Sequence, residues 1–239
     1  MINHKFDKIL TVILVILIIA IVGVVGYWGY DIFQRYYLNV GANEVLEEFD
    51  KQVSTLNISI EPTATPIPIA NEVIENPTTT TTTPPTTTRR PMATPTPRPA
   101  NAIDLKYKGY DVAGKIEIPS TKANLPILTV ATDSSMKVAV GILYGVGLNQ
   151  IGNTVITGHN YRNGALFSKN DNIKNGDEIF ITDVMGVRIR YIVFNKYYTT
   201  STDFEYATRD TAGTREITLQ SCTDDGRSRV IVCAREENT

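Results

Sequence analysis

Histidine, cysteine and tryptophan are scarce in this chain, and their scarcity excludes several kinds of site. The 239 residues contain two histidines, two cysteines and one tryptophan. The cysteines are not spaced as a CxxC pair, and two histidines are too few to complete most tetrahedral metal sites. We therefore expect no zinc site, no other bound metal and no organic cofactor.

A large excess of charge of either sign is also lacking. The formal net charge is −2, and residues 101–239 hold 16 acidic and 16 basic side chains. A protein that binds nucleic acid through its phosphates needs a clustered basic excess. The sequence therefore predicts an ordinary solvated surface and no nucleic-acid partner.

Charge is absent altogether from residues 9–27, ILTVILVILIIAIVGVVGY. A helix of this length spans roughly 29 Å, close to the thickness of the hydrocarbon core of a bilayer. A cleaved signal peptide is the alternative, but its apolar region is shorter and ends in small residues. Here the run ends in Tyr27, and Trp28 and Tyr30 follow, which is typical of a membrane interface. The sequence therefore favours a transmembrane anchor over residues 9–30.

The charges around the anchor indicate its orientation. Lys5 and Lys8 precede it and favour a cytoplasmic N-terminus of residues 1–8, although Asp7 and Arg35 make the asymmetry modest. We expect a single-pass protein of the cell membrane with all later residues outside the cell.

Two segments separate the anchor from the globular part. Residues 31–60 have no proline and carry apolar side chains among acidic ones, which predicts a helical stalk. An amphipathic helix on the membrane or on a partner is the alternative, but its acidic side would repel an anionic surface. Residues 61–100 hold 10 of the 12 prolines and no glycine, which predicts a semi-rigid linker. O-glycosylation or binding of a proline-motif partner are alternative roles for this linker.

Residues 101–239 have the size of one domain and a mainly β pattern. Short alternating or β-branched runs are separated by turn residues, and helical windows occur only around residues 134–141 and 164–170. The expected strands are residues 114–118, 125–128, 152–157, 178–182, 187–196, 216–222 and 229–234. This pattern predicts a closed or nearly closed barrel, rich in antiparallel pairs.

Three residues of this domain form a candidate catalytic group. Cys222 ends one expected strand, and Arg229 begins the next, so that a hairpin would place them opposite each other. A cysteine nucleophile needs a base or a positive charge nearby. His159 follows the strand 152–157, and the other histidine, His4, lies on the expected cytoplasmic side. The sequence predicts a Cys222–His159 pair, with Arg229 as a fixed donor to a developing oxyanion.

Two members of this group have alternative, non-catalytic interpretations. His159 could be an ordinary surface or core residue, and Arg229 a solvated residue of a strand. Arg227 competes with Arg229, although its place in the turn makes its position less fixed.

The second cysteine is not expected to form a disulfide with the first. In the same hairpin Cys233 pairs near Thr218, about 13 Å along the strand from Cys222. A disulfide needs Cα atoms within about 7 Å. We therefore interpret Cys222 as a free thiol.

Four short motifs follow one another in an order that is specific to one protein family. They are IEIP at 116–119, LPI at 125–127, GNTVITGHN at 152–160 and TLQSC at 218–222, with Arg229 after them. Together with the anchor, they resemble the sortase family of Gram-positive bacteria, over residues 114–234. The family pattern at the cysteine is usually TLxTC, and Ser221 replaces its second threonine.

The resemblance implies an eight-stranded sortase β-barrel and a cysteine transpeptidase. The calcium dependence of some class A sortases is not supported by any acidic cluster in this sequence. Cys222 would attack a backbone carbonyl in a sorting motif similar to LPxTG, near the C-terminus of a secreted protein. His159 would protonate the leaving amine and later deprotonate the incoming one, and Arg229 would bind the oxyanion. The acceptor would be an amine of a peptidoglycan precursor or of a pilin.

The sequence leaves alternatives open for the sortase class and for the type of function. The stretch GHNYRNGALF at 158–167 is similar to class B sortases, yet residues 196–216 lack the helical period of the long helix found there in class B. We expect a class B-like or unclassified sortase. An L,D-transpeptidase would carry arginine two residues after its cysteine, where Asp224 stands. A non-catalytic binding barrel on a stalk has no need for Cys222, His159 and Arg229 together.

Overall fold

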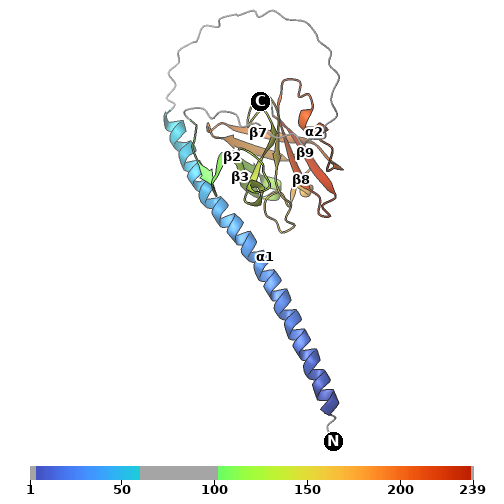
Figure 1. Cartoon of the computed structure of the whole chain (residues 1–239). Coiled ribbons are helices and arrows are strands. Elements are labelled where there is room, and N and C mark those ends of the chain that lie inside the picture. Colours follow the sequence, from blue (N-terminus) through green and yellow to red (C-terminus); the bar gives the residue numbers. More distant parts are fainter. Residues whose placement is uncertain (1–3, 60–101, 238–239) are drawn as a thin grey trace, which may run out of the picture.

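The computed structural model describes residues 4–59 and 102–237. The expected linker, residues 61–100, lies outside the described residues. The remaining chain forms one long helix and one barrel (Figure 1).

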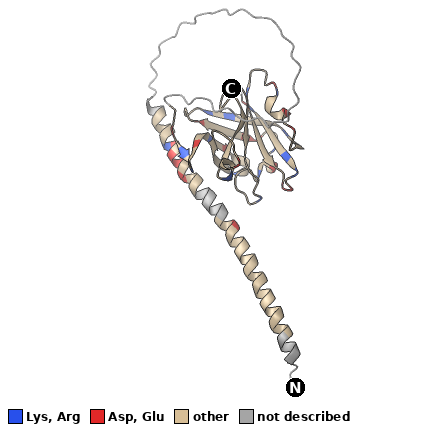
Figure 2. Ribbon diagram, viewed as in Figure 1, with Lys and Arg blue, Asp and Glu red and all other residues tan. Residues whose placement is uncertain are grey.

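The N-terminal helix α1 runs from His4 to Ser59 without a break. Its Ile9–Phe33 segment is long and apolar enough to cross a membrane, and none of it is buried in the protein. Figure 2 shows that, in the part of α1 that is not grey, charged residues become frequent where the helix lies beside the barrel. Length and composition thus agree with the expected anchor, and the membrane itself stays a prediction.

Nine strands occur among the described residues. They are β1 (Lys106–Tyr107), β2 (Tyr110–Ile118), β3 (Ala123–Leu128), β4 (Val140–Gly145), β5 (Gly152–Thr157), β6 (Glu178–Asp183), β7 (Arg188–Thr200), β8 (Arg215–Cys222) and β9 (Ser228–Glu236). Their order is β1-β2-β3-β4-β5-β8-β9-β7-β6, and a further pairing of β2 with β6 closes the sheet. The two-residue β1 stays outside the ring, so the barrel has eight strands, as expected.

The barrel interior explains why these sequences form strands. Apolar side chains of alternate residues point inward and form one core cluster, which includes Ile116, Ile156, Ile181, Leu219 and Val232, each at most 1% exposed. Because a strand alternates its side chains between two faces, these residues all lie on the inner face of the sheet. Most pairs are antiparallel, but β3–β4 and β5–β8 are parallel.

The predicted strands are confirmed, with boundaries that differ by a few residues, whereas the predicted helices are largely wrong. Residues 134–141 hold only a 3₁₀ turn, Ser135–Lys137, and then begin β4, which the sequence analysis missed. Residues 164–170 likewise end in a 3₁₀ turn at Asn170–Asn172. The connection from β7 to β8 holds only the four-residue α2 (Glu205–Thr208), so the long helix typical of class B is absent there.

The last turns of α1 are packed against the barrel and do not stand free of it. Val45, Leu46 and Phe49 are buried in a second core cluster with residues 103–139, and Phe49 is only 1% exposed. The ammonium of the buried Lys115 lies 2.6 Å from a carboxylate oxygen of Asp50. The expected stalk is therefore helical, but its second half is part of the globular body.

Candidate active site

Parallel pairing of β5 and β8 brings the candidate residues together. Thr157 and Gln220 are register partners, and the hydroxyl of Thr157 donates to Gln220 Oε1 at 2.5 Å. One residue further, the backbone N–H of Gly158 donates to the carbonyl of Gln220 at 3.2 Å. β5 ends at Thr157 and β8 ends at Cys222, and His159 and Cys222 each lie two residues beyond the same register pair. The structure thus places the two residues at one edge of the barrel.

Gly158 allows the chain to pass close to Val140 and Phe167 just before His159. A Cβ at this position would lie 2.7 Å from Val140 Cγ1 and 3.0 Å from a ring carbon of Phe167. Contacts this short do not occur without a shift of the neighbours. Any larger residue would therefore push the chain away from the barrel just before His159.

Arg229 is the direct cross-strand partner of Cys222 in the β8–β9 hairpin. Its side chain is half-buried, and its guanidinium Nη1 donates to the carbonyl of Ser228 at 3.3 Å. Arg227 lies in the exposed turn, where its backbone N–H donates to Asp225. The hairpin predicted from sequence is confirmed, and of the two arginines Arg229 has the position fixed by the sheet.

The environment of His159 favours its neutral form. Burial lowers the pKa of its imidazole below 6.5, the carboxylate of Asp133 opposes this, and the nearby ammonium of Lys137 lowers the pKa further. The ring of Tyr161 packs beside the imidazole, with 5.3 Å between ring centroids. A mostly neutral imidazole can accept a proton at neutral pH.

Asn160 is a site residue that the sequence analysis missed. Its Nδ2 donates to the backbone carbonyl of Cys222 at 3.0 Å and to a carboxylate oxygen of Asp224 at 2.8 Å. Its Oδ1 accepts from the backbone N–H of Arg162 at 2.9 Å. Asn160 therefore ties the loop after His159 to the end of β8. The only sequence signal is its place directly after the histidine.

Ser221 and Cys233 are two further residues of the hairpin that holds Cys222. Ser221 is 2% exposed, and its hydroxyl has no hydrogen-bond partner among the described residues. Cys233 pairs with Thr218, as the hairpin register predicted. This register confirms the basis on which a Cys222–Cys233 disulfide was excluded, and burial raises the pKa of the Cys233 thiol.

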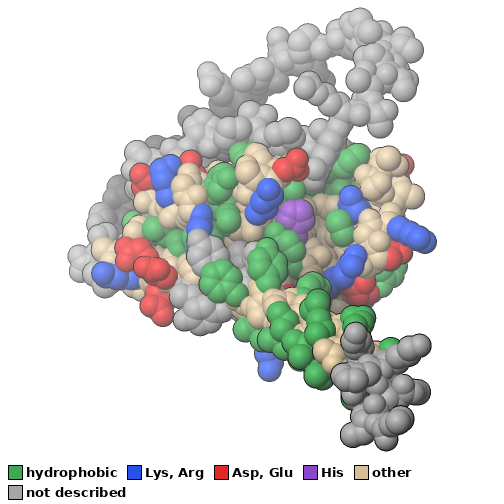
Figure 3. Space-filling view, turned by 60° about the horizontal axis from the view of Figure 1, so that its bottom comes forward, with side chains coloured by type: hydrophobic (Ala, Val, Ile, Leu, Met, Phe, Trp, Pro, Cys, Tyr) green, Lys and Arg blue, Asp and Glu red, His purple; other side chains and the backbone are tan. Residues whose placement is uncertain are grey.

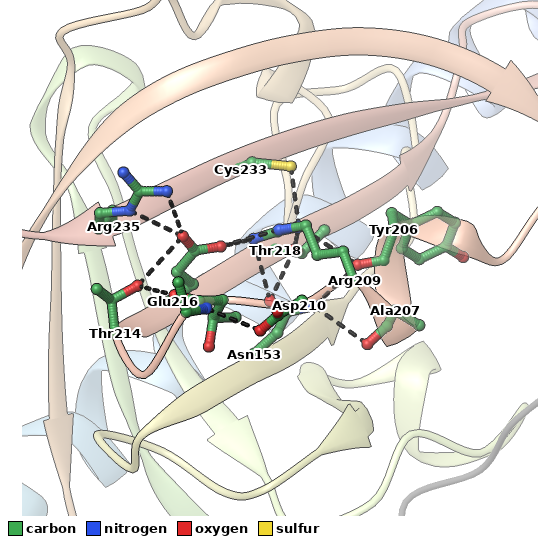
Figure 4. A network of polar contacts seen from close by, with 12 residues as sticks. Asn153, Tyr206, Ala207, Arg209, Asp210, Thr214, Glu216, Thr218, Cys233 and Arg235 are labelled. Carbon is green, nitrogen blue, oxygen red and sulfur yellow. Dashed lines mark hydrogen bonds and ion pairs between the residues drawn. The ribbon is translucent and has the colours of Figure 1, made fainter.

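A buried ionic network fixes the opposite end of β8. Glu216 has a side chain that is 1% exposed, and its carboxylate lies 2.5 Å from Arg209 and 2.7 Å from Arg235 (Figure 4). Arg209 also donates to Thr218 Oγ1 at 2.8 Å and to Cys233 Sγ at 3.3 Å. A buried carboxylate needs such partners, because its desolvation is costly otherwise. The network attaches the α2 connection to the strand that carries Cys222.

The site lies on the side of the barrel from which the apolar helix emerges. Figure 3 shows a histidine in the middle of the face that comes forward together with that helix, with basic side chains on both sides of it. Among the described residues no three His, Cys, Asp or Glu side chains lie close enough to hold a metal ion.

Comparison with known proteins identifies the family. The family model described as "Sortase domain" matches residues 116–237. Sortase A from Corynebacterium diphtheriae has a similar structure, with 29% sequence identity and a TM-score of 0.50. The match covers 54% of this chain and 62% of that protein. None of the curated protein sequences matches this chain.

A sortase of another class is also among the similar solved structures. Sortase C-1 from Actinomyces oris is 23% identical with a TM-score of 0.49, over 53% of this chain and 74% of that one. The assignment to a class B-like group gains no support from these names and stays a prediction. Since the family match extends over just more than half of the chain and includes Cys222, His159 and Arg229, the chain belongs to the sortase family.

Proposed function

We propose that this protein is a membrane-anchored cysteine transpeptidase that cleaves a C-terminal sorting motif similar to LPxTG and transfers the protein to an amine. The observation that carries the proposal is the parallel register of β5 and β8, in which His159 and Cys222 each follow the Thr157–Gln220 pair by two residues, with Arg229 opposite the cysteine in the hairpin. A barrel that only binds a partner has no need of this arrangement. The family match supports the same activity.

In the first half of the reaction, the neutral imidazole of His159 takes the proton of the Cys222 thiol, and the resulting thiolate attacks the carbonyl carbon of the scissile peptide bond. A C–S bond forms, and the carbonyl oxygen becomes an oxyanion that the guanidinium of Arg229 stabilises. When the C–N bond breaks, the leaving amine takes a proton from the His159 imidazolium. The products are a thioester on Cys222, a neutral imidazole and the released C-terminal peptide.

In the second half, an acceptor amine attacks the thioester. The neutral imidazole of His159 removes a proton from this amine, and Arg229 again binds the oxyanion. The C–S bond breaks, and Cys222 leaves as a thiolate. The acceptor amine belongs to a peptidoglycan precursor or to a pilin, and water in its place gives hydrolysis.

The anchor gives this reaction its location. With α1 crossing the cell membrane and residues 1–8 in the cytoplasm, the barrel lies outside the cell, next to the outer leaflet. Secreted proteins that carry the sorting motif are then its substrates. The apolar, unburied Ile9–Phe33 segment supports this placement.

Mass spectrometry tests the proposal most directly. The full-length protein in detergent micelles is mixed with sorting peptides and with triglycine or lysine as acceptor. We expect a thioacyl adduct at Cys222 and a peptide–amine product, both absent in Cys222→Ala. Cys233→Ser is the matched control and keeps the adduct. A panel of sorting motifs that gives no adduct on the folded protein contradicts the proposal.

A further inference from the structure

A cavity of about 850 Å³ lies between α1 and the loop that follows His159. Its helix side includes Tyr27, Trp28 and Ile32, and its loop side includes Arg162 and Lys169. The proposed mechanism uses none of these residues. The cavity is therefore a second concave site on the same face of the molecule.

The position of the cavity along α1 determines which kinds of ligand can reach it. The apolar segment of the helix ends at Phe33, so residues 27–32 form its last turns. Tyrosine and tryptophan at this level are typical of the zone where lipid headgroups meet water. In a membrane-anchored protein, the cavity therefore opens among the headgroups of one leaflet.

The charges of the lining favour an anion. Arg162 and Lys169 are exposed, and neither side chain forms an ion pair within the described part of the chain. One carboxylate, that of Asp31, also lines the cavity, and Asn163 donates to it at 3.4 Å. The lining thus keeps an excess of one positive charge. Guanidinium and ammonium groups are the side chains that bind phosphate best.

A smaller cavity of about 370 Å³ adjoins the first one, since Gly164 and Lys169 line both. Its lining is mostly polar and includes Asn43, Asn124 and Asn170. The side-chain amide nitrogen of Asn170 is buried and has no hydrogen-bond partner in the described residues. Polar side chains of this lining, such as Asn43 and Asn124, can donate hydrogen bonds to a hydroxyl oxygen of a ligand.

We propose that the two cavities together bind the headgroup of an anionic, hydroxyl-bearing phospholipid of the outer leaflet. The phosphate lies at Arg162 and Lys169, the hydroxyl groups enter the polar cavity, and the acyl chains follow the apolar surface of α1. This inference rests on the membrane anchoring proposed above. Through the hydrogen bonds of Asn160 to Arg162 and to Cys222, a bound lipid would hold the loop that carries His159.

Native mass spectrometry of the full-length protein in mixed micelles tests this binding. The probes are phosphatidylglycerol, phosphatidylcholine and water-soluble glycerol 1-phosphate. We expect preferential retention of phosphatidylglycerol, reduced about 25-fold in Arg162→Gln/Lys169→Gln, since each basic residue near an anionic surface contributes a factor of about five. The control Lys51→Gln/Lys174→Gln removes two exposed charges that line neither cavity, and it keeps the preference.

Three results would overturn the inference. They are equal retention of phosphatidylcholine, an equal loss in the control variant, and competition by glycerol 1-phosphate as strong as that of the lipid. Flotation with vesicles reports membrane insertion, and the Cys222 adduct reports the transpeptidase. If both are intact while the lipid preference is missing, only the lipid site is wrong.

Discussion

The contact of α1 with the barrel gives the sharpest test of the structure. Phe49 is 1% exposed and lies in the cluster that joins the helix to residues 103–139. Truncation of a buried phenylalanine to alanine costs about 3–5 kcal/mol, because apolar surface is lost and a cavity remains. We therefore expect Phe49→Ala to destabilise the barrel, although Phe49 precedes it by more than fifty residues.

The expected change in Tm follows from this range of free energies. For a domain of 150–250 residues, 1 kcal/mol shifts Tm by about 2–4 °C, so that Phe49→Ala lowers Tm by about 6–20 °C. The assay is thermal unfolding of the full-length protein in micelles, followed by near-ultraviolet circular dichroism of the barrel tyrosines. Glu47→Ala is the control, because Glu47 is exposed on the same helix. Equal Tm values for the two variants would refute the docking of α1.

Three further predictions concern the site. Because burial lowers the pKa of His159, the unfolded chain binds its proton more readily, and stability falls as the pH drops from 6.5 through the folded pKa. Nuclear magnetic resonance titration should show this pKa raised in Lys137→Gln and lowered in Asp133→Asn, and unchanged values would contradict the assigned causes. Gly158→Ala should lose most turnover and cost about 1–3 kcal/mol, measured by adduct formation and urea unfolding, because its methyl group overlaps Val140. Ser221→Ala should leave the unfolding free energy unchanged or raise it by up to about 1 kcal/mol, since its buried hydroxyl has no partner among the described residues; a large loss in the same urea assay would show that one exists.

The strands were predictable where local pattern decides the structure. The run GNTVIT at 152–157 is rich in β-branched residues and is bounded by glycines, and β5 has these bounds. β4 was missed because its sequence, VGILYG, contains two glycines and reads as a short apolar run. Its strand form depends on pairing with β3 and β5, which no local pattern encodes.

The candidate site was predictable where the proposed reaction requires a particular type of residue. Cys222 and His159 were identified because the domain contains few residues of their types, and Arg229 because the hairpin places it opposite Cys222. Asn160 was missed because its role depends on the parallel register of β5 and β8. Docking of α1 was missed for a similar reason, since apolar residues on a stalk do not reveal which distant surface they cover.

One consequence concerns the segment between residues 59 and 102. Because the end of α1 and the start of the barrel belong to the same packed body, this segment closes a loop, and under the proposed anchoring the helix sets the height of Cys222 above the bilayer. Doubling the length of a loop costs only about 0.6 kcal/mol. The segment can therefore lengthen, shorten or accept an inserted domain without moving the site, and the two halves of the molecule could even be supplied as separate chains.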